Sequence, residues 1–270
     1  MNKNYLLKKT KQKIALKKYS EKTADTYLFY LQKFLEFLEN KKLEADKDSA
    51  QKFLQQQNKL RPQTFNLILN TLHFFFANVQ TNVDKLQIKY KKRSPQKIQT
   101  LSHLQIEKLL NLTRNQKHYL IFALSFGSGL KLNELTNLKI KDLDFEKNTL
   151  NIFSKSSRGV RETILPIILK NKLQDYISDK KMSNFLFTNT IGEQLSDRSL
   201  QQAFKLALKR AKINKNVSFQ VLRHSFATHL LESGQSIKSL QQVLGHKNIR
   251  STQKYQKNIR ISVSQIKSPL

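Results

Sequence analysis

The last third of the chain carries three residues whose types and spacing suggest chemistry on phosphate: Arg223, His246 and Tyr255. An arginine guanidinium can grip a phosphate with two parallel hydrogen bonds. A tyrosine hydroxyl can attack phosphorus and form a covalent link to it. Together these residues indicate an enzyme that breaks and rejoins a nucleic-acid backbone through its own side chain.

The charge of the chain favours the same kind of partner. Its 270 residues include 49 Lys and Arg against 19 Asp and Glu, for a formal charge of +30 and a pI of about 10.2. A field of this strength attracts polyanions and steers them to the surface. An AT-rich genome would explain the preference for lysine over arginine, but it would not explain the shortage of acids. We therefore expect a nucleic acid as partner.

Composition also excludes several classes of protein. The absence of cysteine excludes disulfides, thiolate metal sites and a cysteine nucleophile, and it fits a cytoplasmic location. Since no run of about 18 apolar residues occurs, we expect no membrane span, and no apolar segment of a secretory signal follows the basic N-terminus. No acidic cluster suited to a metal is evident in the sequence.

The elements that must position these residues begin with a helical head. Apolar residues at helical spacing predict one helix after Ser20, which can cap it, and two more over about 46–58 and 62–79. The four phenylalanines of this region are expected in its core rather than on a base-stacking platform: Phe65, Phe74, Phe75 and Phe76. Residues 1–14 form a lysine-rich lead that we expect to be flexible or weakly helical.

Residues 88–97 differ in composition from the head. The segment is basic, contains Pro95 and lacks periodicity, which is typical of a linker. Its cations are candidate DNA contacts: Lys89, Lys91, Lys92 and Arg93. The linker is either a solvated tether or a strap that lies across phosphates.

A second region, over residues 98–258, is again predicted to be mainly helical. Ser102 can cap its first helix, and Gly127 to Gly129 are expected to break the second. Two β-like segments, 148–153 and 161–165, predict a hairpin with its turn at 154–160. Further helices are expected at about 168–179, 197–212, 219–233 and 236–244. The fold class is therefore mainly α with a small antiparallel β-sheet.

Residues 219–255 closely resemble the C-terminal signature of the tyrosine recombinase (phage integrase) family, especially its Xer-like branch. The resemblance lies in Val-Leu-Arg-His-Ser-Phe, Leu-Gly-His and the following tyrosine. Residues 127–135, Gly-Ser-Gly-Leu-Lys-Leu-Asn-Glu-Leu, are similar to the first motif of the family. The head resembles its SAM-like core-binding domain. The resemblance implies a two-domain DNA clamp, with a core-binding domain at 15–87 and a catalytic domain at 98–258.

The resemblance also implies a role for each matching residue. Tyr255 would attack a DNA phosphodiester and leave a 3′-phosphotyrosine and a 5′-hydroxyl. The reaction would require no ATP, metal or other cofactor, and the lack of an evident acidic cluster agrees with this. Arg223 would grip a non-bridging oxygen, and His246 would donate a hydrogen bond to the same phosphate. Glu134 would hold the catalytic residues in position without contacting the phosphate itself. Lys155 in the hairpin turn would protonate the leaving oxygen.

Four further positions leave alternatives open. Arg158 and Arg161 lie close to Lys155 in the sequence, and we count both as candidate DNA contacts. Lys131 stands where the family carries arginine, so a bidentate phosphate contact becomes a point contact. Gln220 stands where the family usually carries histidine, and an amide cannot carry a proton. These departures predict an active but slow enzyme.

The same resemblance implies the assembly and the setting. We expect a homotetramer, or a hetero-tetramer with a related recombinase, on two sites of double-stranded DNA. The tail at 259–270 would either dock into a neighbouring subunit or fray. The protein would act in the cytoplasm at the nucleoid, in chromosome dimer resolution or in integration and excision of a mobile element. The alternatives are a binding-only relative and a type IB topoisomerase-like relaxer.

Overall fold

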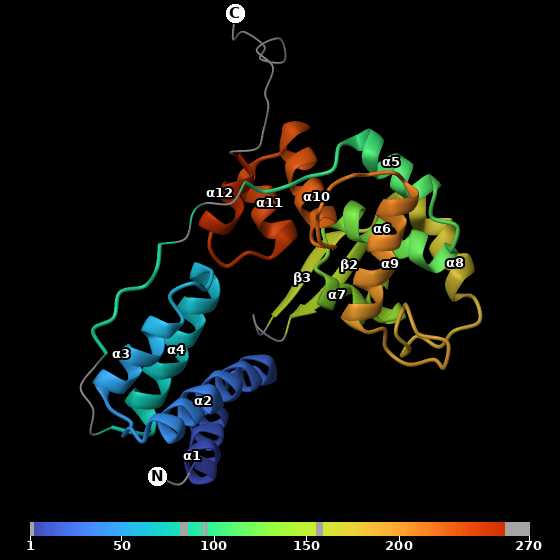
Figure 1. Cartoon of the computed structure of the whole chain (residues 1–270). Coiled ribbons are helices and arrows are strands. Elements are labelled where there is room, and N and C mark those ends of the chain that lie inside the picture. The colour runs from blue at the N-terminus through green and yellow to red at the C-terminus, as the bar shows by residue number, and fades with distance from the viewer. Residues whose placement is uncertain (1–2, 82–85, 93, 95–96, 155–158, 257–270) are drawn as a thin grey trace, which may run out of the picture. The chain divides into compact units, whose positions relative to one another are not determined.

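A computed structural model describes residues 3–81, 86–92, 94, 97–154 and 159–256 of the chain (Figure 1). The chain divides into two compact units, Met1–Gln96 and Lys97–Leu270, here called the N-terminal and the C-terminal unit. The N-terminal unit is helical, and the C-terminal unit combines helices with a three-stranded antiparallel sheet. This confirms the predicted fold class.

The described part of the N-terminal unit contains four helices, and local chemistry explains where three of them begin. The helices are α1 (Lys3–Leu16), α2 (Glu21–Lys41), α3 (Lys47–Gln56) and α4 (Pro62–Asn78). The Ser20 hydroxyl accepts the N–H of Thr23 and begins α2, as predicted. Asp46 and Ser49 form a capping box at the start of α3. Pro62 occupies the first position of α4, where a missing N–H costs nothing.

Aromatic side chains fill the core of the N-terminal unit. Phe34 and Phe75 are fully buried, and their rings lie 6.4 Å apart at a steep angle. The predicted core phenylalanines are all buried: Phe65, Phe74, Phe75 and Phe76. Burial of these rings against α2 and α3 is what holds the short helices together.

The lysine-rich lead differs from its prediction, because most of it is helix α1. Leu6, Thr10 and Ile14 recur every four residues and form one buried stripe against α2 and α4. The lysines between them occupy the solvent side, and Lys3 pairs with Glu36 on α2. The apolar stripe is narrow, which is why the lysines dominate the pattern in the sequence.

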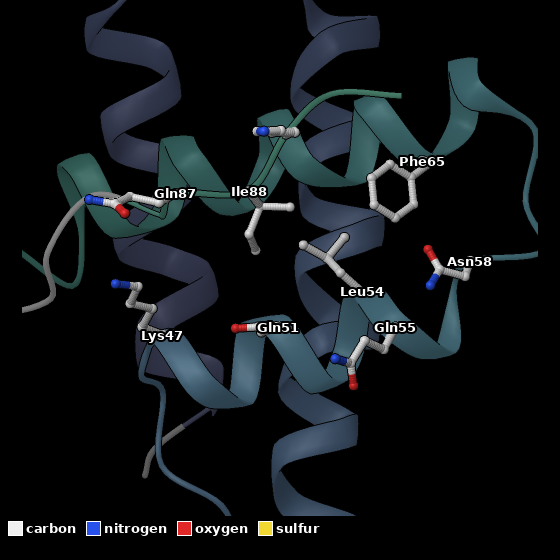
Figure 2. Close-up of a pocket in the computed structure, with 9 residues that line it drawn as sticks. Lys47, Gln51, Leu54, Gln55, Asn58, Phe65, Gln87 and Ile88 are labelled. Atoms are coloured by element: carbon white, nitrogen blue, oxygen red, sulfur yellow. The ribbon is translucent and has the colours of Figure 1, made fainter. Parts of the chain in front are cut away.

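The segment after α4 packs onto the N-terminal unit for part of its length. The Asn66 side chain donates to the carbonyl of Lys91 and accepts its N–H, both at 2.9 Å. The Lys91 ammonium donates to the Asn58 carbonyl and lies over the Phe65 ring. Ile88 and Leu54 face a hollow between this segment, α3 and α4 (Figure 2). The first part of the predicted linker is therefore bound to the head.

The C-terminal unit contains most of the helices. They are α5 (His103–Asn111), α6 (Gln116–Ser128), α7 (Leu132–Asn137), α8 (Lys170–Ile177), α9 (Asp197–Arg210), α10 (Val221–Glu232), α11 (Ile237–Leu244) and α12 (Arg250–Gln256), with 3-10 turns at Ile140–Asp142 and Ile167–Leu169. Helix α12, which was not predicted, is short and has no apolar periodicity. Within the described residues, no helix combines the length and apolarity needed to cross a bilayer.

The sheet consists of β1 (Leu143–Asp144), β2 (Thr149–Ser154) and β3 (Gly159–Ile164) in that order. In the predicted hairpin, Thr149 pairs with Ile164 and Ser154 with Gly159. Strand β3 begins two residues before the predicted segment. The hydroxyl of Thr163 on β3 donates to the carbonyl of Ser128, which fixes the sheet to the end of α6.

Helix α6 lies at the centre of the C-terminal unit, in contact with α5, α7, α10 and β3 (Figure 1). Leu120, Phe122 and Leu124 are fully buried, as expected for a helix that is apolar on every side. The helix ends at Ser128 within the predicted break, and Gly129 caps it in a left-handed conformation with φ of 62°. A Cβ at this position would overlap the Phe226 ring, so only glycine fits.

Candidate active site

Arg223 in the first turn of α10 is almost completely buried, with 1% of its surface exposed. Its Nη1 donates to the carbonyl of Gly129 at 2.6 Å, and its Nη2 to that of Leu244 at 2.7 Å. These carbonyls lie at the C-terminal ends of α6 and α11, where helix dipoles favour a cation. Burial lowers the pKa of the guanidinium and Glu134 opposes that shift, so Arg223 remains charged.

Glu134 on α7 is the carboxylate behind this cation. Its Oε2 accepts the N–H of Lys131 at 2.9 Å and Nη2 of Arg161 at 2.7 Å, and lies 3.5 Å from Nη1 of Arg223. Burial by itself would raise the pKa of Glu134. The nearby cations and the backbone N–H outweigh burial and lower the pKa. The carboxylate is therefore ionised and holds two arginines in place.

Arg161 on β3 was expected among the DNA contacts, but it points into the site instead. Besides Glu134, it donates through Nη1 to the carbonyl of Val243 at the end of α11. Its side chain is 11% exposed, and its stem passes Gly245 so closely that a Cβ there would overlap it. Both terminal nitrogens of Arg161 thus have partners within the protein.

Lys131 precedes α7 and is more accessible than Arg161 and Arg223. Its side chain is 39% exposed, and Nζ lies 3.7 Å from Oε1 of Glu134. Burial lowers its pKa, with Glu134 opposing the shift and the two arginines adding to it. The ammonium is therefore close to the arginine centre yet able to meet an anion from outside.

His246 follows Gly245, which ends α11 with a left-handed φ of 65°. Its Nε2 lies 3.1 Å from Nη2 of Arg223, and its Nδ1 lies 2.9 Å from the hydroxyl of Thr252. Burial, followed by the charges of Arg223 and Lys254, lowers the pKa of His246 to about 4. Because arginine only donates, Nε2 accepts from Arg223 and Nδ1 carries the ring proton.

Tyr255 on α12 lies against the same group, with 1% of its surface exposed. Its ring is parallel to that of His246 with centroids 6.4 Å apart, and its hydroxyl lies 3.0 Å from Nδ1 of His224. Burial raises the pKa of Tyr255, whereas the charge and a hydrogen bond of Arg223 lower it. The structure thus brings the phenol and the guanidinium together at one point.

Gln220 lies at the start of α10, half-buried, and its carbonyl accepts the N–H of His224 one turn later. Lys155, Arg158 and Arg93 lie outside the described residues. Lys89 and Lys92 are exposed on the N-terminal unit, and Lys91 is half-buried. The predicted linker lysines therefore belong to a different unit from the catalytic candidates.

Sequence reasoning missed three members of the site. His224 and Thr252 were not among the candidate residues, and Arg161 was counted as a DNA contact rather than as a partner of Glu134. A helical spacing of four from Gln220 puts His224 on the same side of α10, and three residues separate Thr252 from Tyr255 on α12. These spacings are visible in the sequence, but the packing of α12 on α10 is not.

The charges of the site suit an anion. Three cationic side chains, Arg161, Arg223 and Lys131, surround the single carboxylate of Glu134, and the charge of Lys254 lies near Arg223. A cluster with this excess of positive charge, held by fixed backbone dipoles, stabilises a phosphate in which negative charge develops. The hydroxyl of Tyr255 lies in the same cluster.

Family models match both units of the chain. The model described as "Phage integrase family" matches residues 99–260, and that of a "Phage integrase, N-terminal SAM-like domain" matches residues 6–84. Together they extend over most of the sequence.

Individual proteins agree with these matches. Tyrosine recombinase XerA of Pyrococcus horikoshii is 32% identical over 250 residues, or 88% of this chain and 84% of its own. A lambda integrase dimer bound to a core site has the same fold, with a TM-score of 0.75 at 17% identity over 96% of this chain and 99% of its own. The Tn1549 transposon integrase with circular intermediate DNA gives 0.74 at 20% identity over 96% of each chain.

Proposed function

This chain belongs to the phage integrase family of tyrosine recombinases, and from that membership we propose that it is a site-specific DNA recombinase. It cuts and rejoins double-stranded DNA through a 3′-phosphotyrosine on Tyr255. The observation that carries the proposal is the convergence of Tyr255 and Arg223 in one cationic cluster.

The proposed reaction is a transfer of phosphorus between oxygens. The Tyr255 oxygen attacks the phosphodiester, and the bond to the 5′-oxygen breaks. The new ester conserves the bond energy, so a second 5′-hydroxyl can reverse the step without ATP. What remains for the protein is to stabilise negative charge, and Arg223 is preorganised for this by two helix-end carbonyls.

Lys131 and Arg161 together would make the contacts that a single arginine at position 131 would make. Arg161 supplies the planar guanidinium that binds Glu134, which leaves the accessible ammonium of Lys131 for a non-bridging oxygen. A point charge holds that oxygen less well than a bidentate fork. We therefore expect cleavage that is real but slower than with arginine at 131.

The remaining roles follow the chemistry of each side chain. His246 lies beside Arg223 and would share its phosphate oxygen; a bound phosphate raises the pKa of His246 and allows Nε2 to donate. Gln220 would donate an amide hydrogen bond from the start of α10. Lys155 would protonate the leaving 5′-oxygen, an assignment that rests on the family motif.

DNA binding and assembly are proposed from charge and from the relatives. Lys89, Lys91, Lys92, Arg93 and Arg158 would contact phosphates, and the formal charge of +30 favours binding at the nucleoid in the cytoplasm. The solved lambda integrase is a dimer on its core site, which supports more than one subunit on DNA. We propose a tetramer on two sites, of this chain alone or with a related recombinase, in which the tail at 259–270 docks into a neighbour.

The biological task follows from where the target site lies. Similar proteins include Xer recombinases and a transposon integrase, so the proposed role covers chromosome dimer resolution and integration or excision of a mobile element. A site next to the replication terminus would favour the first, and a site at the ends of an element the second.

The proposal is tested by trapping the covalent intermediate. The protein is incubated with duplexes of randomised sequence that carry a nick, so that the short cleaved end diffuses away and the phosphotyrosine persists. Denatured protein–DNA adducts are then isolated and their DNA is sequenced. We expect adducts on one recurring sequence, lost in Tyr255→Phe.

The alternatives predict different outcomes. Binding to a recurring sequence without adducts would overturn the proposal and identify a binding-only relative. Adducts without strand exchange between two marked duplexes, but with relaxation of supercoiled plasmid, would identify a type IB topoisomerase-like enzyme. Strand exchange would identify a recombinase.

A further inference from the structure

The hydroxyl of Tyr255 has a specific partner that the family motif does not assign. Nδ1 of His224 lies 3.0 Å from it, across the contact between α10 and α12. Tyr255 is almost completely buried, so bulk water is not at hand to take a proton from its hydroxyl.

The direction of this hydrogen bond follows from the neighbours of the phenol. Burial raises the pKa of Tyr255, but the positive charge of Arg223 lowers it, which favours release of the phenol proton. Burial, followed by the charges of Lys254 and Arg223, lowers the pKa of His224 to about 4, so its ring is neutral at pH 7. A neutral imidazole carries one proton, and in the tautomer with that proton on Nε2, which we assign here, Nδ1 accepts the phenol proton.

The position of His224 on α10 is also informative. Gln220 lies one helical turn earlier, and its carbonyl accepts the N–H of His224. An amide at 220 can donate or accept a hydrogen bond but cannot take up a proton. The titratable group one turn later on the same side of the helix is His224, and its Nδ1 lies next to the phenol whose proton must leave.

We propose that His224 is the general base that removes the proton of Tyr255 during cleavage. The inference rests on the proposed function, since it names the proton acceptor for the same reaction. As the Tyr255 oxygen bonds to phosphorus, its proton moves to Nδ1 of His224, and the 5′-oxygen leaves with a proton from the acid that we assign to Lys155. In rejoining, imidazolium His224 returns its proton to the departing phenol oxygen.

The charges around His224 make this transfer depend on the substrate. The groups that face it are Arg223 on α10 and Lys254 and Tyr255 on α12, with His246 on the far side of the phenol ring. The positive charges of Lys254 and Arg223 disfavour the imidazolium form of His224 in the free protein. A bound phosphodiester brings a negative charge to the same cluster, which raises the pKa of His224. The base thus gains strength only when DNA is in place.

The test replaces His224 by asparagine, whose Oδ1 can accept the phenol proton in a hydrogen bond but cannot carry it away. The readout is the single-turnover rate of phosphotyrosine formation on the nicked duplex that the trapping experiment identifies. We expect this rate to fall about 10²–10⁴-fold, the usual contribution of a general base. The matched control is His229→Asn, which removes another half-buried histidine of α10 away from the phenol; we expect no change in its rate.

A second variant separates chemistry from structure. Fluorinated tyrosine at position 255 is a more acidic phenol that needs less help from a base. We expect the rate deficit of His224→Asn to shrink by at least about tenfold with this nucleophile. A deficit of equal size with both nucleophiles would overturn the proposal, because a purely structural defect slows both alike. A variant that cleaves at the rate of the unchanged protein would also overturn it.

Failure of the two proposals looks different. If the unchanged protein forms no covalent adduct, the proposed function fails and the role of His224 fails with it. If the unchanged protein forms the adduct and His224→Asn forms it as fast, only the proton acceptor is wrong. The rate of the unchanged protein should also rise with pH until His224 in the DNA complex is neutral, and this limb should vanish in His224→Asn.

Discussion

The two units of the molecule are held together in different ways. The N-terminal unit buries aromatic rings such as Phe34 and Phe75 around an apolar core. Among the described residues, the buried charged side chains are Glu134, Asp142 and Arg223, all in the C-terminal unit. Burying charge costs several kcal/mol per ion unless partners compensate. The N-terminal unit is therefore stabilised mainly by apolar burial. The C-terminal unit has a lower unfolding free energy than it could have, because it keeps a buried cation in a fixed position.

The largest expected effect comes from removing the carboxylate behind this cation. Glu134→Gln leaves Arg161 and Arg223 without their common anion, and we expect the C-terminal unit to lose about 3–5 kcal/mol of unfolding free energy. Hydrogen exchange in denaturant would report α10 and α4 separately. The control is Glu36→Gln on α2, an exposed carboxylate paired with Lys3, which should leave both helices unchanged.

The contrast between the two units would be wrong if α10 and α4 lost protection from hydrogen exchange equally in Glu134→Gln, because the two units would then unfold together. The contrast would also be wrong if α10 kept its full protection from exchange, since the buried arginines would then not depend on the carboxylate of Glu134.

A smaller effect is expected in Arg161→Lys, which keeps the charge near Glu134 but cannot donate to both the carboxylate and the Val243 carbonyl. Misplacement of Glu134 and its partners should slow phosphotyrosine formation by up to about 10²-fold. DNA affinity should not change, because both terminal nitrogens of Arg161 point inward. Arg210→Lys, at the exposed end of α9, is the control and should cleave normally. A matching loss of DNA affinity in Arg161→Lys would restore its first interpretation as a DNA contact.

The pH dependence of stability should also differ between the units. The pKa values of His224, His229 and His246 lie near 4 in the folded protein, below the ordinary value of 6.5. The unfolded chain therefore binds more protons between these values, and stability must fall as pH decreases through that window. We expect hydrogen exchange of α10 to accelerate from pH 6.5 downward, after correction for the intrinsic exchange rate.

Helix α4 should respond less over the same range of pH. It carries one histidine, His73, whose pKa burial also lowers. An equal acceleration of exchange in α4 and α10 would contradict the contrast between the two units. The depressed pKa of Glu134 contributes only at still lower pH, because a carboxylate loses its stabilising charge below its own range.

The smallest effect is expected from Lys131→Arg. A bidentate contact to a non-bridging oxygen should raise the cleavage rate by about 3- to 10-fold, the equivalent of roughly 1 kcal/mol of charge-assisted hydrogen bonding. Single-turnover cleavage of the nicked duplex measures it. A lower rate would mean that the pocket has been rebuilt around lysine and that Arg161 already occupies the place of the missing guanidinium.

Much of the fold follows from local patterns in the sequence. Ser20, Asp46 and Ser102 are helix caps where capping residues were expected or available, and the hairpin lies where alternation and turn residues put it. Helix α1 was harder to predict because only three residues of its narrow stripe are buried among many lysines. Helix α12 was missed because it has few apolar residues and depends on packing against α10 and α11.

The sequence by itself determined the chemistry available: a basic chain with an arginine, a histidine and a tyrosine in a motif of one family. Residue types and local spacing suffice for that, because caps, periodicity and net charge act over a few residues. Only the tertiary structure decided that Arg161 turns inward to Glu134 and that His224 lies 3.0 Å from the Tyr255 hydroxyl. Those contacts join β3 to α7 and α10 to α12, and packing between elements distant in sequence sets them.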